Sequence, residues 1–181
     1  MSVTEREQGV EPVRVRPNDP LYADVLDFLY QEAELLDDDR LEEWLGLMDD
    51  GLSYRMPVRQ TVAREDGRGF AAEASFFDDD LATLTLRVRR IVESANAHAE
   101  MPATRSRRFV TNVRVEAVGD EVRARSSLLL LRSRWDSTWF EFLAARRDDV
   151  LRPSEDGMKL VRRDILIEQS VGKSPNLSVF L

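Results

Sequence analysis

Residues 105–135 read RSRRFVTNVRVEAVGDEVRARSSLLLLRSRW, and this stretch decides the fold class. From residue 107 to residue 118 apolar and polar side chains alternate, which is the period of a β-strand. Gly119-Asp120 supplies a tight turn, and residues 122–135 then predict a second long strand that returns beside the first. The first-strand side chains that this alternation places together on one face are Phe109, Thr111, Val113, Val115 and Ala117.

Two further strands are predicted after this hairpin, over residues 138–151 and 158–169. Asp136-Ser137 makes the turn before the first of them, and the run SEDG at residues 154–157 makes the turn before the second. Long strands joined by such short turns pair in antiparallel fashion. The second half of the chain therefore predicts a mainly antiparallel sheet.

The apolar period is that of helices in most of the first hundred residues. Asn18-Asp19-Pro20 supplies a capping residue and a proline suited to a first helical turn, and residues 21–36 predict the helix that follows. The other elements predicted in this half are helices over residues 40–48 and 78–94, a short strand over residues 53–58 that stops at Pro57, and a loop over residues 59–77.

Helices followed by long antiparallel strands are typical of the α+β class. We expect three N-terminal helices to pack on one face of a curved, mainly antiparallel sheet, so that the sheet and helices form a cone with an interior pocket. Residues 1–17 are expected to be an extended, irregular arm. Residues 18–181 are expected to form a single domain, because their number suits one hydrophobic core.

Composition narrows the classes of protein. Hydrophobic residues make up 43% of the 181, and no apolar run has the length needed to span a bilayer. The first residues, MSVTEREQGV, are polar and do not resemble a signal peptide, so we expect a cytoplasmic protein. The net charge of −8 is a poor match for binding the phosphates of nucleic acid.

The counts of cysteine and histidine limit the metal chemistry of this chain. It has no cysteine and one histidine, His98. A Rieske cluster needs two of each residue, and a mononuclear iron site of the facial-triad type needs two histidines. We therefore predict no metal ligands and no catalytic residues in this chain. His98 follows the third predicted helix and is interpreted as a surface or interface residue, rather than as a general base or ligand.

Charged side chains gather at several points along the chain. The acidic clusters are Asp37-Asp38-Asp39, Asp49-Asp50 and Asp78-Asp79-Asp80. We interpret them as helix N-termini and solvated faces rather than as a divalent-metal site. The basic cluster Arg105, Arg107 and Arg108 is equally compatible with an intersubunit contact and with a solvated strand edge, and less so with an anion site. The apolar residues Leu177, Val179, Phe180 and Leu181 are expected to pack into a core or a subunit contact.

Six segments, in order along the chain, resemble the β subunits of bacterial aromatic-ring-hydroxylating dioxygenases. They are FLYQEAELLDDDRLEEWLGLMDDGLSYRMPVR (28–59), FFDDDLATLTLRVRRI (76–91), RSRRFVTNVRV (105–115), SSLLLLRSR (126–134), RRDDVLR (146–152) and NLSVFL (176–181). Together they cover nearly all of residues 20–181. Arg108 departs from the pattern, since many members of the family carry histidine there.

The resemblance implies a cystatin-like cone of the nuclear-transport-factor-2-like superfamily. It implies a non-catalytic small subunit, which forms a homotrimer within an α3β3 hexamer. The Rieske [2Fe–2S] cluster and mononuclear iron are then expected on the partner α subunit, with electrons supplied from NADH through a reductase and often a ferredoxin. The absence of cysteine agrees with iron held elsewhere.

Cone scaffolds also hold enzymes, so a stand-alone dehydratase, isomerase or polyketide-cyclase-like enzyme is the alternative. Such enzymes place a carboxylate or histidine in the cavity with aromatic hydrogen-bond donors. Aromatic residues on strands are also ordinary packing and interface material. A non-catalytic module that binds a small ligand in the cavity is a third possibility. The candidates for a cavity or an interface are Tyr54, Arg105, Arg108, Trp135 and Trp139, with Asp136 as a further cavity group.

Overall fold

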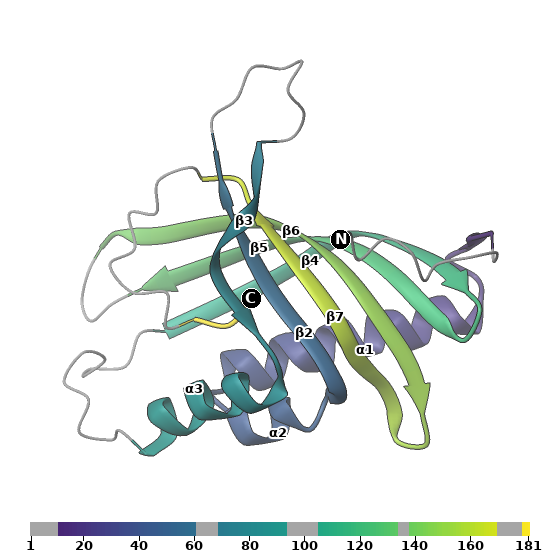
Figure 1. Cartoon of the computed structure of the whole chain (residues 1–181), viewed down its shortest axis with the longest axis horizontal. Helices are drawn as coiled ribbons and strands as arrows, with labels where there is room; N and C mark the ends of the chain where they lie inside the picture. The colour runs from purple at the N-terminus through teal and green to yellow at the C-terminus, as the bar shows by residue number, and fades with distance from the viewer. Residues whose placement is uncertain (1–10, 61–68, 94–104, 134–137, 170–178) are drawn as a thin grey trace.

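The computed structural model describes residues 11–60, 69–93, 105–133, 138–169 and 179–181 and is shown in Figure 1. The helices within these ranges are α1 (Pro20–Asp37), α2 (Leu41–Leu45) and α3 (Leu81–Glu93). The strands are β1 (Val13–Val15), β2 (Met48–Arg59), β3 (Phe70–Asp79), β4 (Arg105–Val118), β5 (Glu121–Ser133), β6 (Phe140–Ser154) and β7 (Gly157–Ile167).

The described strands form one curved sheet in the order β1-β4-β5-β6-β7-β2-β3 (Figure 1). Neighbouring strands are antiparallel except β2 and β7, which are parallel. Helix α1 packs on β4 and β7, and α3 packs on β2, so the helices cover one face of the sheet. This arrangement confirms the predicted α+β class and the mainly antiparallel sheet.

Helix α1 forms where the capping signal predicted it. Asp19 has extended backbone angles, its carboxylate accepts a hydrogen bond from the Leu21 amide at 2.9 Å, and Pro20 occupies the first turn. The residues that α1 buries recur at three- and four-residue intervals, which is the period of one helical face. They are Val25, Phe28, Leu29, Glu32, Leu35 and Leu36, and Glu32 is the one charged member.

The β4–β5 hairpin is confirmed, but the predicted face of β4 is wrong in its first half. The pairing changes register between Thr111 and Arg114, which inserts an extra residue at Asn112, whose φ is +54°. A one-residue shift moves every later side chain to the other face. Phe109 is therefore 50% exposed on the outer face, whereas Val113 is 6% exposed and lies in the core.

The predicted loop over residues 59–77 is wrong for residues 70–77, which form the first part of strand β3, while residues 61–68 lie outside the described residues. This strand lies at the edge of the sheet and pairs with β2 alone, among the described strands. Its sequence, FAAEASFFDD, lacks the β-branched residues that signal a strand. Strand β2 likewise continues past Pro57, where its register with β3 shifts. Proline is tolerated at such an irregular pairing.

Three smaller boundaries also differ from the prediction. Helix α2 is shorter than predicted, and α3 begins after the acidic cluster because Asp78 and Asp79 belong to β3. Asp80 caps α3 by accepting a hydrogen bond from the Thr83 amide at 2.8 Å. In the expected irregular arm, Val13–Val15 form β1 against β4, and residues 1–10 lie outside the described part.

The core fills the space between the helices and the inner face of the sheet. Large buried side chains come from both layers, including Leu29, Trp44, Leu130 and Ile165. Phe180 and Leu181 also lie in this core. For these two residues, packing into a core is the correct one of the two expectations, the other being a subunit contact. No helix in the described ranges is long and apolar enough to cross a membrane.

The cap of α1 gives a direct test of the helix boundary. Replacing Asp19 by alanine removes the acceptor for the Leu21 amide, and we expect a loss of about 1 kcal/mol in the free energy of unfolding. Urea denaturation measures this loss. The matched control is Asp24→Ala, an exposed position inside the same helix, which should change stability by less than half as much. Equal effects of the two substitutions would contradict the capping role.

Candidate functional site

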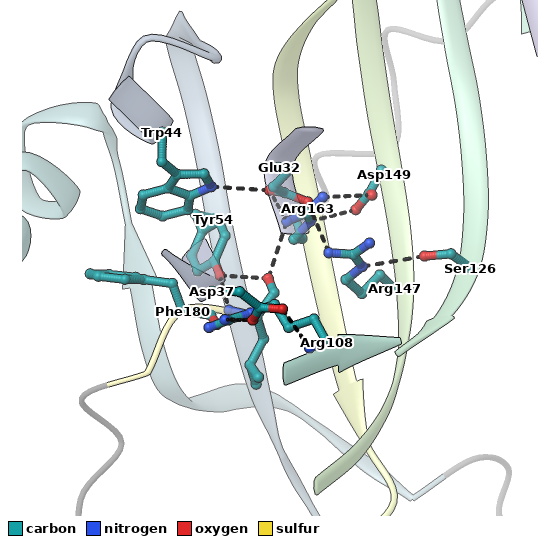
Figure 2. Close-up of polar contacts among 11 residues, drawn as sticks. Glu32, Asp37, Trp44, Tyr54, Arg108, Ser126, Arg147, Asp149, Arg163 and Phe180 are labelled. Atoms are coloured by element: carbon teal, nitrogen blue, oxygen red, sulfur yellow. Dashed lines mark hydrogen bonds and ion pairs between the residues drawn. The ribbon is translucent and has the colours of Figure 1, made fainter. Parts of the chain in front are cut away.

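A buried carboxylate lies at the centre of the cone. Glu32 of α1 is fully buried and accepts three hydrogen bonds from groups on other elements (Figure 2). The donors are Trp44 Nε1 at 3.2 Å, Arg147 Nη1 at 2.9 Å and Arg163 Nη1 at 2.5 Å. Glu32 thereby joins both N-terminal helices to the inner face of β6 and β7.

The register of the sheet places the partners of Glu32 together. Asp149 lies directly opposite Arg163 across β6 and β7, and its two oxygens accept from Arg163 Nε and Nη2 at 2.8 Å each. Ser126 lies opposite Arg147 across β5 and β6, and its Oγ accepts from Arg147 Nε at 3.2 Å. We call these five residues, Glu32, Ser126, Arg147, Asp149 and Arg163, the buried cluster.

Charge pairing sets the protonation of the buried cluster. Burial by itself would raise the pKa of Glu32, but the positive charges of Arg163 and Arg147 outweigh it and lower that pKa to about 2. Burial likewise works to lower the pKa of Arg163, yet Asp149 and Glu32 raise it well above its usual value. Burial and the nearby Arg163 charge lower the pKa of Arg147. Glu32 is therefore ionised at neutral pH and has two cationic partners.

Residues 179–181 occupy the interior beside this cluster. The Tyr54 hydroxyl donates to the Leu181 carbonyl oxygen at 2.7 Å and accepts from the Leu181 amide at 2.8 Å. Arg163 Nη1 donates to the same carbonyl oxygen at 3.1 Å. The Phe180 ring lies against Trp44, with ring centroids 4.6 Å apart. Burial raises the pKa of Tyr54, so its hydroxyl keeps the proton that it donates.

Arg108 connects this segment to the end of α1. Its Nη1 donates to Asp37 Oδ1 at 2.6 Å, and its backbone amide donates to Asp37 Oδ2 at 2.9 Å. Its Nη2 donates to the Phe180 carbonyl oxygen at 2.7 Å (Figure 2). The side chains of Arg108 and Asp37 are each only 3% exposed. A solvated strand edge and a solvated acidic cluster are therefore wrong for these two residues, because they neutralise each other inside the chain.

The family model described as "Ring hydroxylating beta subunit" matches residues 31–174. The chain belongs to this family of β subunits. It is 37% identical over 177 residues to the benzene 1,2-dioxygenase subunit beta of Pseudomonas putida, an alignment that covers 94% of this chain and 92% of that protein. It is 36% identical over 173 residues to the biphenyl 2,3-dioxygenase subunit beta of Rhodococcus jostii, covering 91% of each.

Solved structures agree with this family. A naphthalene 1,2-dioxygenase structure with indole bound in its active site matches with a TM-score of 0.76 and 25% identity, covering 88% of this chain and 84% of that one. A putative scytalone dehydratase from Novosphingobium aromaticivorans matches with a TM-score of 0.60 at 12% identity, covering 82% and 85%, which shows the fold alone. The family resemblance and the cone fold predicted from the sequence are confirmed.

The residues singled out in the sequence lie in different parts of this β subunit. Tyr54 lies opposite Arg163 across β2 and β7 and bonds Leu181, and Arg108 bonds Phe180. Arg105 is exposed at the start of β4, and Trp139 is 82% exposed before β6. The structure brings Tyr54 and Arg108 together at residues 179–181 and leaves Arg105 and Trp139 outside the core. The positions of His98, Trp135 and Asp136 lie outside the described residues.

Sequence reasoning missed the charged members of the buried cluster. Two signals were present. Glu32 interrupts the apolar stripe of α1, and the segment RRDDVLR at 146–152 puts charges into a strand that the sheet order makes central. Neither signal names a partner, because Glu32 and Arg163 are 131 residues apart in the sequence.

The arrangement of the buried cluster suits structure better than acid–base catalysis. A general base works best with a pKa near the operating pH, and the pKa of Glu32 is about 2. Both of its oxygens are already engaged by arginine. Within the described ranges there is no group of three or more His, Cys, Asp or Glu residues able to hold a metal ion. These contacts give no support to a stand-alone cone enzyme.

Replacing Glu32 tests how much its carboxylate contributes to the stability of the fold. In Glu32→Gln, both arginines lose their shared anion while they remain buried, and we expect a loss of about 3–5 kcal/mol in the free energy of unfolding. Chemical denaturation of the two proteins gives this difference. Glu34→Gln, an exposed position on the same helix, serves as the matched control. A change below 1 kcal/mol in Glu32→Gln would show that the cluster does not hold the layers together.

The lowered pKa of Glu32 also predicts a pH dependence. Because the pKa in the folded chain is about 2 and the ordinary value is 4.5, the stabilisation is complete above pH 4.5. It is lost as the pH falls from 4.5 towards 2. At about 1.4 kcal/mol per pKa unit, the loss from this group is about 3 kcal/mol. Urea titrations at a series of pH values should show it in the wild type and not in Glu32→Gln. Parallel curves for the two proteins would contradict the prediction.

Proposed function

We propose that this chain is the non-catalytic, structural subunit of a multicomponent aromatic-ring-hydroxylating dioxygenase. It supports an iron-containing α subunit that carries out cis-dihydroxylation of aromatic compounds. The observation that carries the proposal is the cone interior, where arginine–carboxylate pairs and residues 179–181 engage the polar groups that a cavity enzyme would use. Membership of the β-subunit family supports it.

The cofactors of such a system are assigned to the α subunit. A Rieske cluster takes two cysteines and two histidines, and this chain has no cysteine and one histidine. Its residues therefore do not fit either the cluster or a facial-triad iron site. In this proposal the α subunit holds both centres and NADH supplies the electrons in the cytoplasm. β subunits of dioxygenases pair with α subunits, and we extend this to an α3β3 assembly.

The outer face of the sheet offers the contact surface for such an assembly. We define the outer patch as Phe109, Leu129, Phe140 and Phe142, which lie on the face opposite the helices. Phe109 pairs directly with Leu129, and Phe142 lies opposite Leu131, which is two residues further along β5. Leu129 is 39% exposed and Phe142 is 55% exposed. Contiguous apolar surface of this kind marks protein contacts, and we assign it to the β trimer, with Trp139 beside it.

Co-expression tests the assembly. The chain is produced with the α subunit encoded beside it, and the purified complex is measured by size-exclusion chromatography with light scattering. The expected mass is that of three α and three β subunits, with iron and acid-labile sulfide present in proportion to α. Recovery of this chain free of any α subunit would contradict the proposal.

A substitution in the outer patch should separate assembly from folding. Phe142→Asp places a charge in the apolar contact, and we expect at least a tenfold weaker association of β subunits with an unchanged circular dichroism spectrum. Analytical ultracentrifugation over a range of concentrations measures the association. Leu86→Asp is the matched control, because Leu86 is an exposed apolar residue on α3, away from the patch. Loss of assembly in both variants, or in neither, would contradict the assignment of the outer patch to the interface between β subunits.

A further inference from the structure

The contacts of Phe180 resemble those of a bound ligand. Two side chains lie against its ring, with the Trp44 ring centroid 4.6 Å away and the Arg87 guanidinium carbon 5.0 Å from the Phe180 centroid. Its carbonyl oxygen accepts a hydrogen bond from Arg108 Nη2 at 2.7 Å. The ring is thus held by an aromatic and a cationic face, while the oxygen is held by a second cation.

Arg108 has more hydrogen-bonding capacity than this occupant uses. Its Nε is buried and has no hydrogen-bond partner, although its Nη1 and Nη2 are both engaged. Nε and Nη2 lie on one edge of the planar guanidinium, and Arg163 uses that same edge to hold both oxygens of Asp149. An amide carbonyl offers one oxygen to this edge, whereas a carboxylate offers two. The free Nε therefore points to a ligand with one more oxygen.

The atoms that fill this space define the class of ligand. From the ring of Phe180 through Cβ and Cα to the carbonyl carbon, the residue has the skeleton of a 3-phenylpropanoyl group. The corresponding acid adds the second oxygen for Arg108 Nε. Tyr54, whose hydroxyl bonds the Leu181 amide and carbonyl, gains a free donor when residues 179–181 withdraw.

We propose that the cone interior is a binding site for arylalkanoic acids and that Phe180 is its intramolecular occupant. Trp44 and Arg87 hold the aryl ring, and Arg108 binds the carboxylate through Nε and Nη2. Asp37 orients Arg108 by accepting from Nη1 and from the backbone amide. An arylalkanoic acid and residues 179–181 compete for the same space. This site lies within one chain and does not depend on the proposed assembly with an α subunit.

The experiment removes the Phe180 ring by substitution and adds an arylalkanoic acid as a probe. Full-length Phe180→Ala is titrated with 3-phenylpropionate, and binding is followed by calorimetry and by the shift in melting temperature. We expect saturable binding, at least tenfold tighter than to the wild type, because the ring site is open. Two probes test the two halves of the ligand: 3-phenylpropan-1-ol has the ring without the carboxylate, and acetate has the carboxylate without the ring. Each should bind at least tenfold more weakly.

A matched variant tests the role of Arg108. Arg108→Gln with Asp37→Asn, made in the Phe180→Ala background, removes the cation and its partner together, so that no buried charge is left alone. Binding of 3-phenylpropionate should fall at least tenfold, while binding of the alcohol should not change. Equal binding of the acid and the alcohol to Phe180→Ala, or no binding of either, would overturn the proposal.

A second measurement on the wild-type chain covers the case in which Phe180→Ala does not fold. With tryptophan labelled by ¹⁵N, the indole resonance of Trp44 reports the ring that now lies against it. Saturating 3-phenylpropionate should shift this resonance, because the ligand ring replaces that of Phe180. The proposal would be overturned if neither 3-phenylpropionate nor 3-phenylpropan-1-ol, at tens of millimolar, shifted the Trp44 resonance.

Discussion

The pairing of Glu32 with Arg147 and Arg163 is the interaction on which the rest of the structure depends. A carboxylate and two guanidiniums, all fully removed from water, are tolerated only where each charge has a partner in good geometry. Their partners come from α1, β6 and β7, and Trp44 adds α2. This constrains the docking of α1 on the sheet, because a displacement that separates Glu32 from the two arginines would leave buried charges unpaired.

The same constraint separates the inside of the cone from its outside. Inside, Arg163 and Tyr54 hold Leu181, and Arg108 holds Phe180, so that residues from the end of the sequence complete the core. Outside, aromatic and aliphatic side chains of β4, β5 and β6 remain exposed. A chain that commits its polar groups internally and presents apolar surface externally is suited to assembly. This division agrees with its membership of the β-subunit family.

Elements with long, regular patterns were predictable, and elements defined by their neighbours were not. Helix α1 carries its own cap and apolar stripe, and the β4–β5 hairpin carries its turn and alternation. Strand β3 has a weak local signal and exists because β2 offers it an edge to pair with. The bulge at Asn112 likewise left no reliable trace in the alternation, so Phe109 was placed on the wrong face. Pairing energy comes from the partner strand, which local sequence does not describe.

The sequence by itself determined the fold class and the family of this chain. It also determined that the chain alone cannot hold a Rieske cluster or a two-histidine iron site. Counting cysteine and histidine needs no coordinates, and collinear segments identify relatives without them. Only the tertiary structure decided which polar and charged groups meet. Tyr54 and Leu181 are 127 residues apart in the sequence, and Asp37 and Arg108 are 71 apart. Such contacts are set by strand register and helix docking, which depend on the whole core at once, so no local pattern encodes them.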